Sequence, residues 1–161
     1  MTIDISKTAL IEIDVQNDFC PSYLLPGGER VPGALAVEGG AEVIHPLNSL
    51  AGEFGRQGGQ VIATADWHPR GHISFASTHG RKPGEVLELP DGENQALWPD
   101  HCVQGSAGAA FHEELDLKNV NLIVRKGFRQ GIDSYSAFFE NDHTTPTGLE
   151  GYLKYLALDT V

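Results

Sequence analysis

Basic residues are scarce in this chain of 161 residues: 11 Lys and Arg stand against 22 Asp and Glu, for a formal net charge of −11. No cluster of Lys or Arg offsets this charge, so nucleic acid and anionic membrane surfaces are poor partners. Long apolar runs are lacking too, since none approaches the roughly 20 residues that cross a bilayer. The N-terminus, residues 1–4, carries no basic segment followed by an apolar stretch. We therefore expect no signal peptide and a cytoplasmic location.

Cysteine is also rare, with only Cys20 and Cys102 in the chain. Two cysteines do not make a disulfide scaffold, and in a cytoplasmic protein we expect both to be reduced. As nucleophiles they lack a favourable context, because neither stands on a strand-to-helix turn where a helix N-terminus could lower the thiol pKa. We interpret both as structural rather than catalytic residues.

Strand and helix patterns alternate along the chain. Apolar runs predict strands at residues 8–14, 60–64 and 121–126, with a fourth strand beginning at 159–161, and helical spacing predicts helices over 41–54 and 147–156. Residues 19–40 and 66–108 are predicted to be loops. The length suits one domain, and the alternation predicts an α/β fold with a mostly parallel sheet and helices on both faces.

Polar residues stand where three of these strands end. In parallel sheets functional residues gather at the carboxyl ends, and Asp14, Asp66 and Lys126 each lie at or just past such an end. Asp14 could simply cap a loop, and Lys126 could be a snorkelling strand-end lysine. The functional alternative makes Asp14 a general base or acid whose pKa is tuned by its site. If the two meet across neighbouring strands, the lysine would keep the aspartate ionised.

The segment of residues 64–72, TADWHPRGH, has the composition of a metal-binding loop. Asp66 and His68 lie two residues apart after a predicted strand, and His101 follows a second Trp-Pro pair. Carboxylate and imidazole groups are ligands for Zn²⁺, Mn²⁺ or Fe²⁺. The structural alternative is a helix cap with loop hydrogen bonds, because Asp-x-His is common. We favour one divalent ion, zinc first, held by Asp66, His68 and His101, with His72 as a fourth candidate.

Aromatic residues are concentrated in the predicted loops rather than in the strands. Most such side chains pack a loop onto the core, but a pocket walled by rings would suit a flat aromatic ligand. The candidates are Phe19, Trp67, Trp98, Tyr135 and Phe138.

Four motifs in this order resemble the nicotinamidase/pyrazinamidase group of the isochorismatase-like hydrolases. They are LIEIDVQNDFC at residues 10–20, TADWHPRGHISF at 64–75, LWPDHCVQG at 97–105, and RKG with DSYSAF at 125–138. The resemblance runs from about residue 8 to residue 161. It implies a doubly wound α/β fold and hydrolysis of nicotinamide, and of pyrazinamide, to the acid and ammonia in NAD salvage. The metal-ligand motifs favour nicotinamidase over isochorismatase, which lacks that metal site.

The resemblance also implies a mechanism in which a cysteine attacks the amide carbon and forms a thioester that water hydrolyses. Asp14 matches the residue that takes the thiol proton and passes it to ammonia, and Lys126 matches the lysine that orients this aspartate. The metal with its waters grips the pyridine nitrogen. Asp66, His68 and His101 match the metal ligands, and His72 matches a fourth ligand that is found in part of the family. Phe19 and Trp98 match the aromatic walls of the pocket.

The sequence departs from the family pattern at its end. The family nucleophile lies on the turn after the strand that begins near residues 159–161, and neither Cys20 nor Cys102 stands there. We therefore expect residues 1–161 to be a single domain that is incomplete at its C-terminus and inactive alone, with the cysteine in a following segment.

Two other functions stay open in the sequence. One is a related hydrolase of the same fold that acts on another small amide or a vinyl ether. The other is a metal- or ligand-binding remnant without catalysis, if the chain truly ends at residue 161. The sequence leaves the oligomeric state undecided, a homo-oligomer included.

Overall fold

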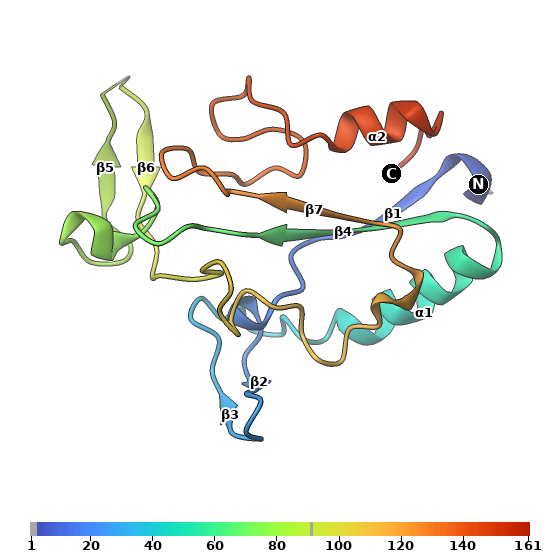
Figure 1. The fold of residues 1–161 in the computed structure, drawn as a ribbon, viewed down its shortest axis with the longest axis horizontal. Coiled ribbons are helices and arrows are strands. Elements are labelled where there is room, and N and C mark those ends of the chain that lie inside the picture. The colour runs from blue at the N-terminus through green and yellow to red at the C-terminus, as the bar shows by residue number, and fades with distance from the viewer. Residues whose placement is uncertain (1–2, 91) are drawn as a thin grey trace.

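A three-stranded parallel sheet forms the centre of the structure, a computed structural model that describes residues 3–90 and 92–161 (Figure 1). In spatial order its strands are β1 (Ala9–Glu12), β4 (Gln60–Asp66) and β7 (Leu122–Lys126). Leu10 lies opposite Val61, and Asp66 lies opposite Lys126. After its first residue β4 is buried along its whole length, as expected of a central strand covered on both faces.

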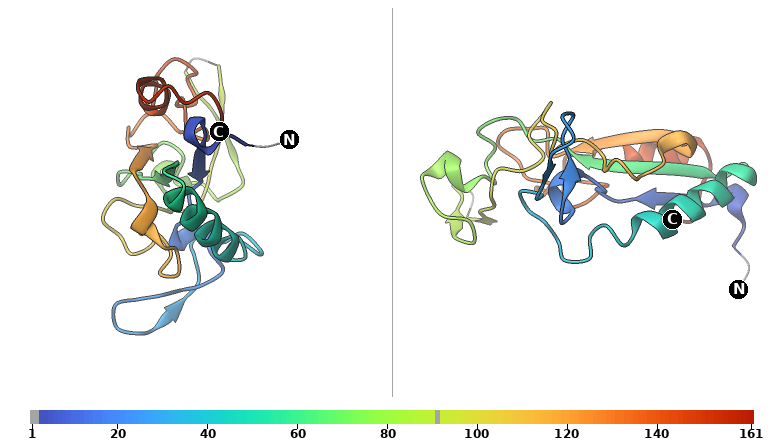
Figure 2. Two further views of the ribbon diagram at one scale, coloured as in Figure 1. Left: turned by 90° about the vertical axis from the view of Figure 1, so that its right-hand side faces the viewer. Right: turned by 90° about the horizontal axis from the view of Figure 1, so that it is seen from below.

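Two helices cover opposite faces of this sheet (Figure 2). Helix α1 (Ile44–Arg56) connects β1 to β4, and helix α2 (Leu149–Tyr155) follows β7. The α2 face buries a cluster of apolar side chains, Ala9, Ile62, Val124, Leu149 and Leu153. The α1 end buries a second cluster, Val15, Cys20, Ile44 and Leu115. The predicted α/β fold with a parallel sheet and helices on both faces is confirmed.

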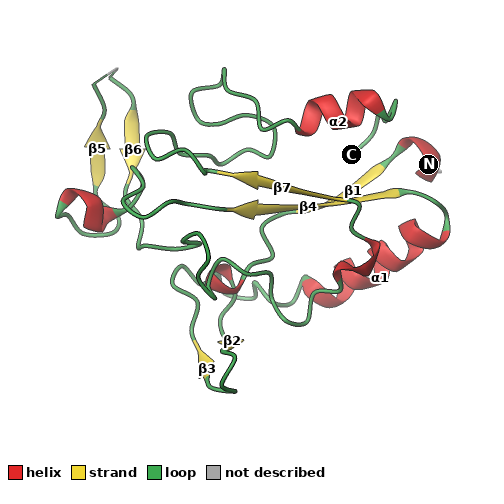
Figure 3. Cartoon of the chain, viewed as in Figure 1, coloured by secondary structure: helices red, strands yellow, loops and turns green. Residues whose placement is uncertain are grey.

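The segments predicted to be loops contain short regular elements (Figure 3). Two antiparallel hairpins form there, β2 (Tyr23–Leu24) with β3 (Arg30–Val31), and β5 (Val86–Glu88) with β6 (Asn94–Ala96). Single 3₁₀ turns lie at Ile5–Lys7, Asn17–Phe19, Ala76–His79 and Leu117–Asn119. The prediction of uninterrupted loops over 19–40 and 66–108 was therefore wrong, because strands of two or three residues leave no periodic signal.

The first predicted strand is shorter than its apolar run. It was expected over residues 8–14, but β1 ends at Glu12, and Asp14 has a left-handed backbone with φ of 51°. Such a conformation is uncommon for a side chain other than glycine and turns the chain out of the strand. The turn brings the Asp14 side chain over the end of β4, where its Oδ1 accepts a hydrogen bond from Thr64 Oγ1 at 2.7 Å.

The outer edge of β1 is largely open in the described part of the chain. Thr8 forms one parallel bridge to Thr160, and the Ala9 N–H donates to the Thr160 carbonyl at 3.0 Å. This single bridge is all that the structure shows of the fourth strand predicted at 159–161. Along the same edge runs a hollow of about 500 Å³, which we call the β1 groove, lined mostly by apolar side chains that include Ile3, Leu10, Ile11, Ile13, Leu50, Phe54, Phe138 and Val161.

None of the helices in the described residues combines the length and the apolar character that a membrane crossing requires.

One carboxyl group is buried within the sheet. Glu12 of β1 is 0% exposed, and neither carboxylate oxygen has a hydrogen-bond partner among the described residues. Burial, with the nearby charge of Asp116, raises the pKa of Glu12 above its ordinary value of 4.5. The pKa of this carboxyl group is higher in the folded protein than in the unfolded chain, so folding favours its protonated form. Its contribution to the free energy of unfolding is fully present below the unfolded-state pKa and is lost as the pH rises through the folded-state pKa.

We therefore expect Glu12→Met to stabilise the fold relative to the unchanged chain, by an amount that grows as the pH rises from about 4 to about 8. The gain should reach about 1–3 kcal/mol, because methionine removes an unpaired polar group from an apolar site. Urea unfolding over this pH range measures it. The control Glu38→Gln, on an exposed loop, should change stability by less than about 0.5 kcal/mol at every pH. A Glu12→Met effect that did not vary with pH would contradict this account.

Candidate active site

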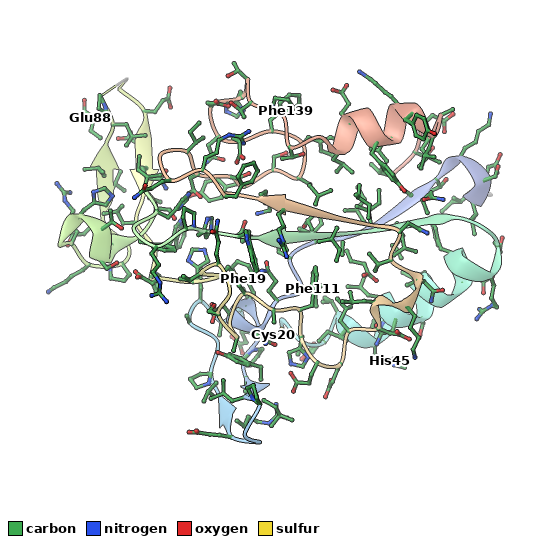
Figure 4. The ribbon with its side chains drawn as sticks, viewed as in Figure 1. Phe19, Cys20, His45, Glu88, Phe111 and Phe139 are labelled. Carbon is green, nitrogen blue, oxygen red and sulfur yellow. The ribbon has the colours of Figure 1, made fainter. Side chains whose placement is uncertain are left out.

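A pocket of about 200 Å³ lies at the carboxyl ends of the parallel strands. Loops after β1, β4 and β7 contribute to it, together with residues 98–101 and 133–135. Figure 4 shows Phe19, one of its walls, beside the neighbouring Cys20 and below the strand β4. The pocket is lined by Asp14, Phe19, Leu35, Asp66, His68, Trp98, His101, Lys126, Asp133, Ser134 and Tyr135.

Three of these side chains form a compact group suited to a metal ion. Asp66 ends β4, His68 follows two residues later, and His101 comes from a separate loop. The Asp66 Oδ2 atom lies 3.6 Å from His68 Nε2 and 4.0 Å from His101 Nε2. The three residues are buried, and each can offer one ligand atom within 4.8 Å of the others.

Hydrogen bonds fix the orientation of both imidazole rings. His68 Nδ1 lies 2.8 Å from the Gly127 carbonyl, and His101 Nδ1 lies 2.7 Å from the Pro99 carbonyl. A carbonyl oxygen only accepts, so each Nδ1 carries the proton and donates it, which leaves each Nε2 lone pair directed at the group. Metal-binding histidines are generally held in this way, by a hydrogen bond from the ring nitrogen that does not bind the ion.

His72 lies behind His68 and outside this group of three. Its ring stacks on that of His68 with centroids 4.1 Å apart. Its Nε2 donates to the Ile132 carbonyl at 3.1 Å, and its Nδ1 accepts from the Ser74 hydroxyl at 2.8 Å. Burial lowers the pKa of His72 to about 4, so the ring is neutral. Both ring nitrogens thus have protein partners already, although His72 also lies in a second close group with His68 and Asp133.

Lys126 links the carboxylates at the ends of the other two strands. Its Nζ lies 2.9 Å from Asp14 Oδ2, and it also donates to Asp66 Oδ1 and to the Ser134 carbonyl. Burial lowers the pKa of Lys126, but the two carboxylates outweigh burial and raise it above its ordinary value. Lys126 is therefore a buried cation that the two acids hold in its charged form.

The two acids differ in their electrostatics. Burial acts to raise the pKa of Asp66, but its contacts with His68 and Lys126 outweigh burial and lower it. Burial also raises the pKa of Asp14, and here the opposing charge of Lys126 is not sufficient to reverse the shift. The sequence predicted that Lys126 would keep Asp14 ionised; its charge acts in that direction, but burial is stronger. Asp14 is therefore the acid of the two that holds a proton more readily.

Aromatic side chains close the rest of the pocket. The Phe19 ring meets the edge of the His101 ring with centroids 5.6 Å apart. On the other side Trp98 Nε1 donates to the Tyr135 hydroxyl at 3.1 Å, which ties two loops together over the pocket. Two of the five aromatic candidates lie elsewhere: Trp67 stacks under the Arg125 guanidinium, and Phe138 lines the β1 groove.

The two cysteines are free and buried, and neither is among the described residues that line the pocket. Burial raises the pKa of the Cys20 thiol and, much further, that of the Cys102 thiol. A thiol with a raised pKa is a poor nucleophile, because the thiolate is the reactive form. Their placement agrees with a structural role for both.

Asp133 lines the pocket but was not among the residues predicted from the sequence. Its Oδ2 accepts a hydrogen bond from Gln95 Nε2 at 2.8 Å, and its Oδ1 accepts from the Ser134 N–H. No strand ends at Asp133 and no metal-ligand spacing includes it, so the only signal was its place at the start of the DSYSAF motif.

We expect Lys126→Met to destabilise the metal-free protein by about 3–5 kcal/mol, because it leaves Asp14 and Asp66 buried close together without their cation. Urea unfolding in the presence of a chelator measures the loss. The control Lys118→Met removes an exposed ion pair with Asp116 and should cost less than about 1 kcal/mol. Equal losses in the two variants would show that the buried ion pairs do not stabilise the fold.

Comparisons with known proteins show the family to which this chain belongs. A sequence model of the Isochorismatase domain matches residues 8–161. The nicotinamidase of Acinetobacter baylyi is 49% identical over 157 residues, which are 97% of this chain and 66% of that protein. The chain therefore spans just under two thirds of the length of this curated relative.

Solved structures show the same fold. A nicotinamidase/pyrazinamidase of Acinetobacter baumanii has a TM-score of 0.83 at 49% identity, over 97% of this chain and 69% of that chain. PnC1 of L. infantum, solved with nicotinate, has a TM-score of 0.71 at 34% identity, over 100% and 70% of the two chains. Pyrazinamidase of Pyrococcus horikoshii, solved with zinc, has a TM-score of 0.65 at 31% identity, over 92% and 64%.

Proposed function

Because the chain belongs to the isochorismatase domain family, we propose that the protein containing these residues hydrolyses nicotinamide to nicotinate and ammonia, and pyrazinamide likewise. One observation carries the proposal: a group of three metal-ligating side chains and the Asp14–Lys126 pair face the same small pocket. The relatives named as nicotinamidases support the substrate. The pocket is walled by aromatic rings, which suit a flat pyridine ring.

We propose that Asp66, His68 and His101 hold one divalent metal ion, with zinc as the first candidate. The donor set fits, since one carboxylate and two imidazoles leave positions open for water or substrate, as in catalytic zinc sites. The zinc in the Pyrococcus horikoshii structure supports this assignment. The ion would act as a template that orients the substrate through its ring nitrogen. His72 would support His68 by stacking rather than bind the ion, because both of its ring nitrogens are already in use.

Asp14 would carry the proton of the reaction. Its raised pKa suits a group that takes a proton from a thiol and returns it to the departing ammonia. The resulting thiolate sulfur bonds to the amide carbon, the C–N bond breaks, and water then cleaves the thioester to give the acid and the free thiol. Lys126 orients Asp14 through its 2.9 Å contact and favours the thiolate by its charge.

The thiol itself would come from outside residues 1–161. Cys20 and Cys102 are buried with raised pKa values, and the described lining of the pocket contains neither. The β1 groove offers an apolar surface and an open parallel edge that reaches Ile13, the neighbour of Asp14, so a strand carrying the cysteine would pack there. The length of the Acinetobacter baylyi relative supports such a segment. Residues 1–161 alone would then bind substrate without hydrolysing it. A cytoplasmic location stays a prediction of the sequence, and the oligomeric state stays undecided.

Intact mass spectrometry of the native protein tests the proposed segment. We expect a mass well above the 17.4 kDa of residues 1–161. A native mass of 17.4 kDa would contradict the thioester mechanism, because no suitable thiol would then reach Asp14.

Ammonia release from nicotinamide tests the function in the native protein. We expect activity that a strong chelator removes and that zinc restores, because the ion positions the substrate. Asp14→Asn should lower kcat by about 10²–10⁴-fold, since asparagine cannot carry the proton. The control Glu38→Gln, on an exposed loop, should keep full activity. Undiminished activity in Asp14→Asn would exclude Asp14 as the proton carrier, and no ammonia release from the metal-loaded protein would exclude the proposed function.

A further inference from the structure

The metal ligands depend on a segment that supplies no ligand itself. Residues 16–18 form a buried turn after β1, and the side chains of Gln16 and Asp18 bond to the main chain at or beside the proposed ligands. Gln16 is 0% exposed, so every polar atom of its side chain must find a partner inside the protein.

The Gln16 side chain completes the sheet at the end of β4. The main chain of β1 turns away at Asp14, so the last residue of β4 has no strand partner on that side. The Gln16 amide takes that place: its Oε1 accepts from the Asp66 N–H at 2.7 Å, and its Nε2 donates to the Asp66 carbonyl at 2.8 Å. A third bond, from Nε2 to the Ala109 carbonyl at 2.9 Å, anchors the amide itself.

Asp18 holds the second ligand segment in a similar way. Its Oδ2 accepts from the Cys102 N–H at 2.7 Å, which fixes the peptide group that joins His101 to Cys102. Cys102 has a left-handed backbone with φ of 45°, so this peptide needs an external partner to stay in place. The Cys102 carbonyl in turn accepts from the His68 N–H at 3.0 Å, so the same residue aligns His68 with His101.

We propose that Gln16 and Asp18 are positioning residues of the metal site: they hold the main chain at Asp66 and at the His101–Cys102 peptide, and thereby set the affinity and geometry of metal binding without contacting the ion. The inference rests on the metal site of the proposed function. Groups that orient metal ligands typically account for about 10- to 100-fold in affinity. Asn17 provides the contrast, because its Nδ2 donates at 2.8 Å to the carbonyl of Ala107, which is neither a proposed ligand nor the neighbour of one.

Zinc affinity of the full chain, measured by competition with a chromophoric chelator, tests the proposal. Gln16→Ala and Asp18→Asn should each weaken zinc binding by about 10- to 100-fold. The matched control Asn17→Ala also loses a buried hydrogen bond and should lower the melting temperature of the metal-free chain, but its zinc affinity should stay close to that of the unchanged chain. The visible absorption of bound Co²⁺, which reports ligand geometry, should change in the first two variants and not in the control.

The outcomes separate this inference from the metal site itself. If the unchanged chain binds zinc and all three variants bind it equally well, the positioning role is wrong while the metal site stands. The positioning role is equally wrong if the loss of zinc affinity in all three variants is proportional to the loss of melting temperature in the metal-free chain. If the unchanged chain binds no zinc, the metal site falls, and the inference falls with it. Should Gln16→Ala fail to fold, the nearly isosteric Asp18→Asn decides the question.

Discussion

The buried charge of Lys126 is the interaction on which the rest of the site depends. One ammonium group at the end of β7 meets a carboxylate at the end of β4 and another just past β1. An isolated buried charge is strongly unfavourable, so none of the three groups could occupy this position without the others. Their mutual attraction therefore fixes the carboxyl ends of all three strands relative to one another, and it also fixes Asp66, one of the three proposed metal ligands.

The same lysine separates the two acids chemically. Asp66 gains contacts from both Lys126 and His68, and its pKa falls, which suits a ligand that must stay ionised. Asp14 shares the lysine but is more strongly affected by burial, and its pKa rises, which suits a group that exchanges protons. Pairs of titratable groups whose environments move their pKa values in opposite directions are typical of acid–base sites. Two identical side chains beside one cation thus acquire opposite pKa shifts, as the proposed roles of metal ligand for Asp66 and proton carrier for Asp14 require.

The meeting point of Asp14, Asp66 and Lys126 could be predicted from the sequence, because each follows an apolar run typical of a parallel strand, although β1 itself ends two residues before Asp14. Other features could not. The hairpins β2–β3 and β5–β6 are too short for a periodic pattern. The position of His72 depends on bonds to Ser74 and Ile132 that no spacing encodes. Glu12 continues an apolar run, and its burial without a partner emerges only when α1 covers that face.

Binding and chemistry are divided between different parts of this fold. The proposed metal ligands, the aromatic walls and the Asp14–Lys126 pair all come from the described strands and loops, and each is held by contacts within them. The thiol has no such place, since both cysteines lie buried away from the pocket. Under the proposed function, binding of a flat heteroaromatic amide would use these residues, whereas its hydrolysis would use a thiol carried by a strand at the open edge of β1. Ile13 lines both the β1 groove and a second hollow that Asp14 also lines. A strand in the groove, as we propose, would therefore place its thiol near the group proposed to take its proton.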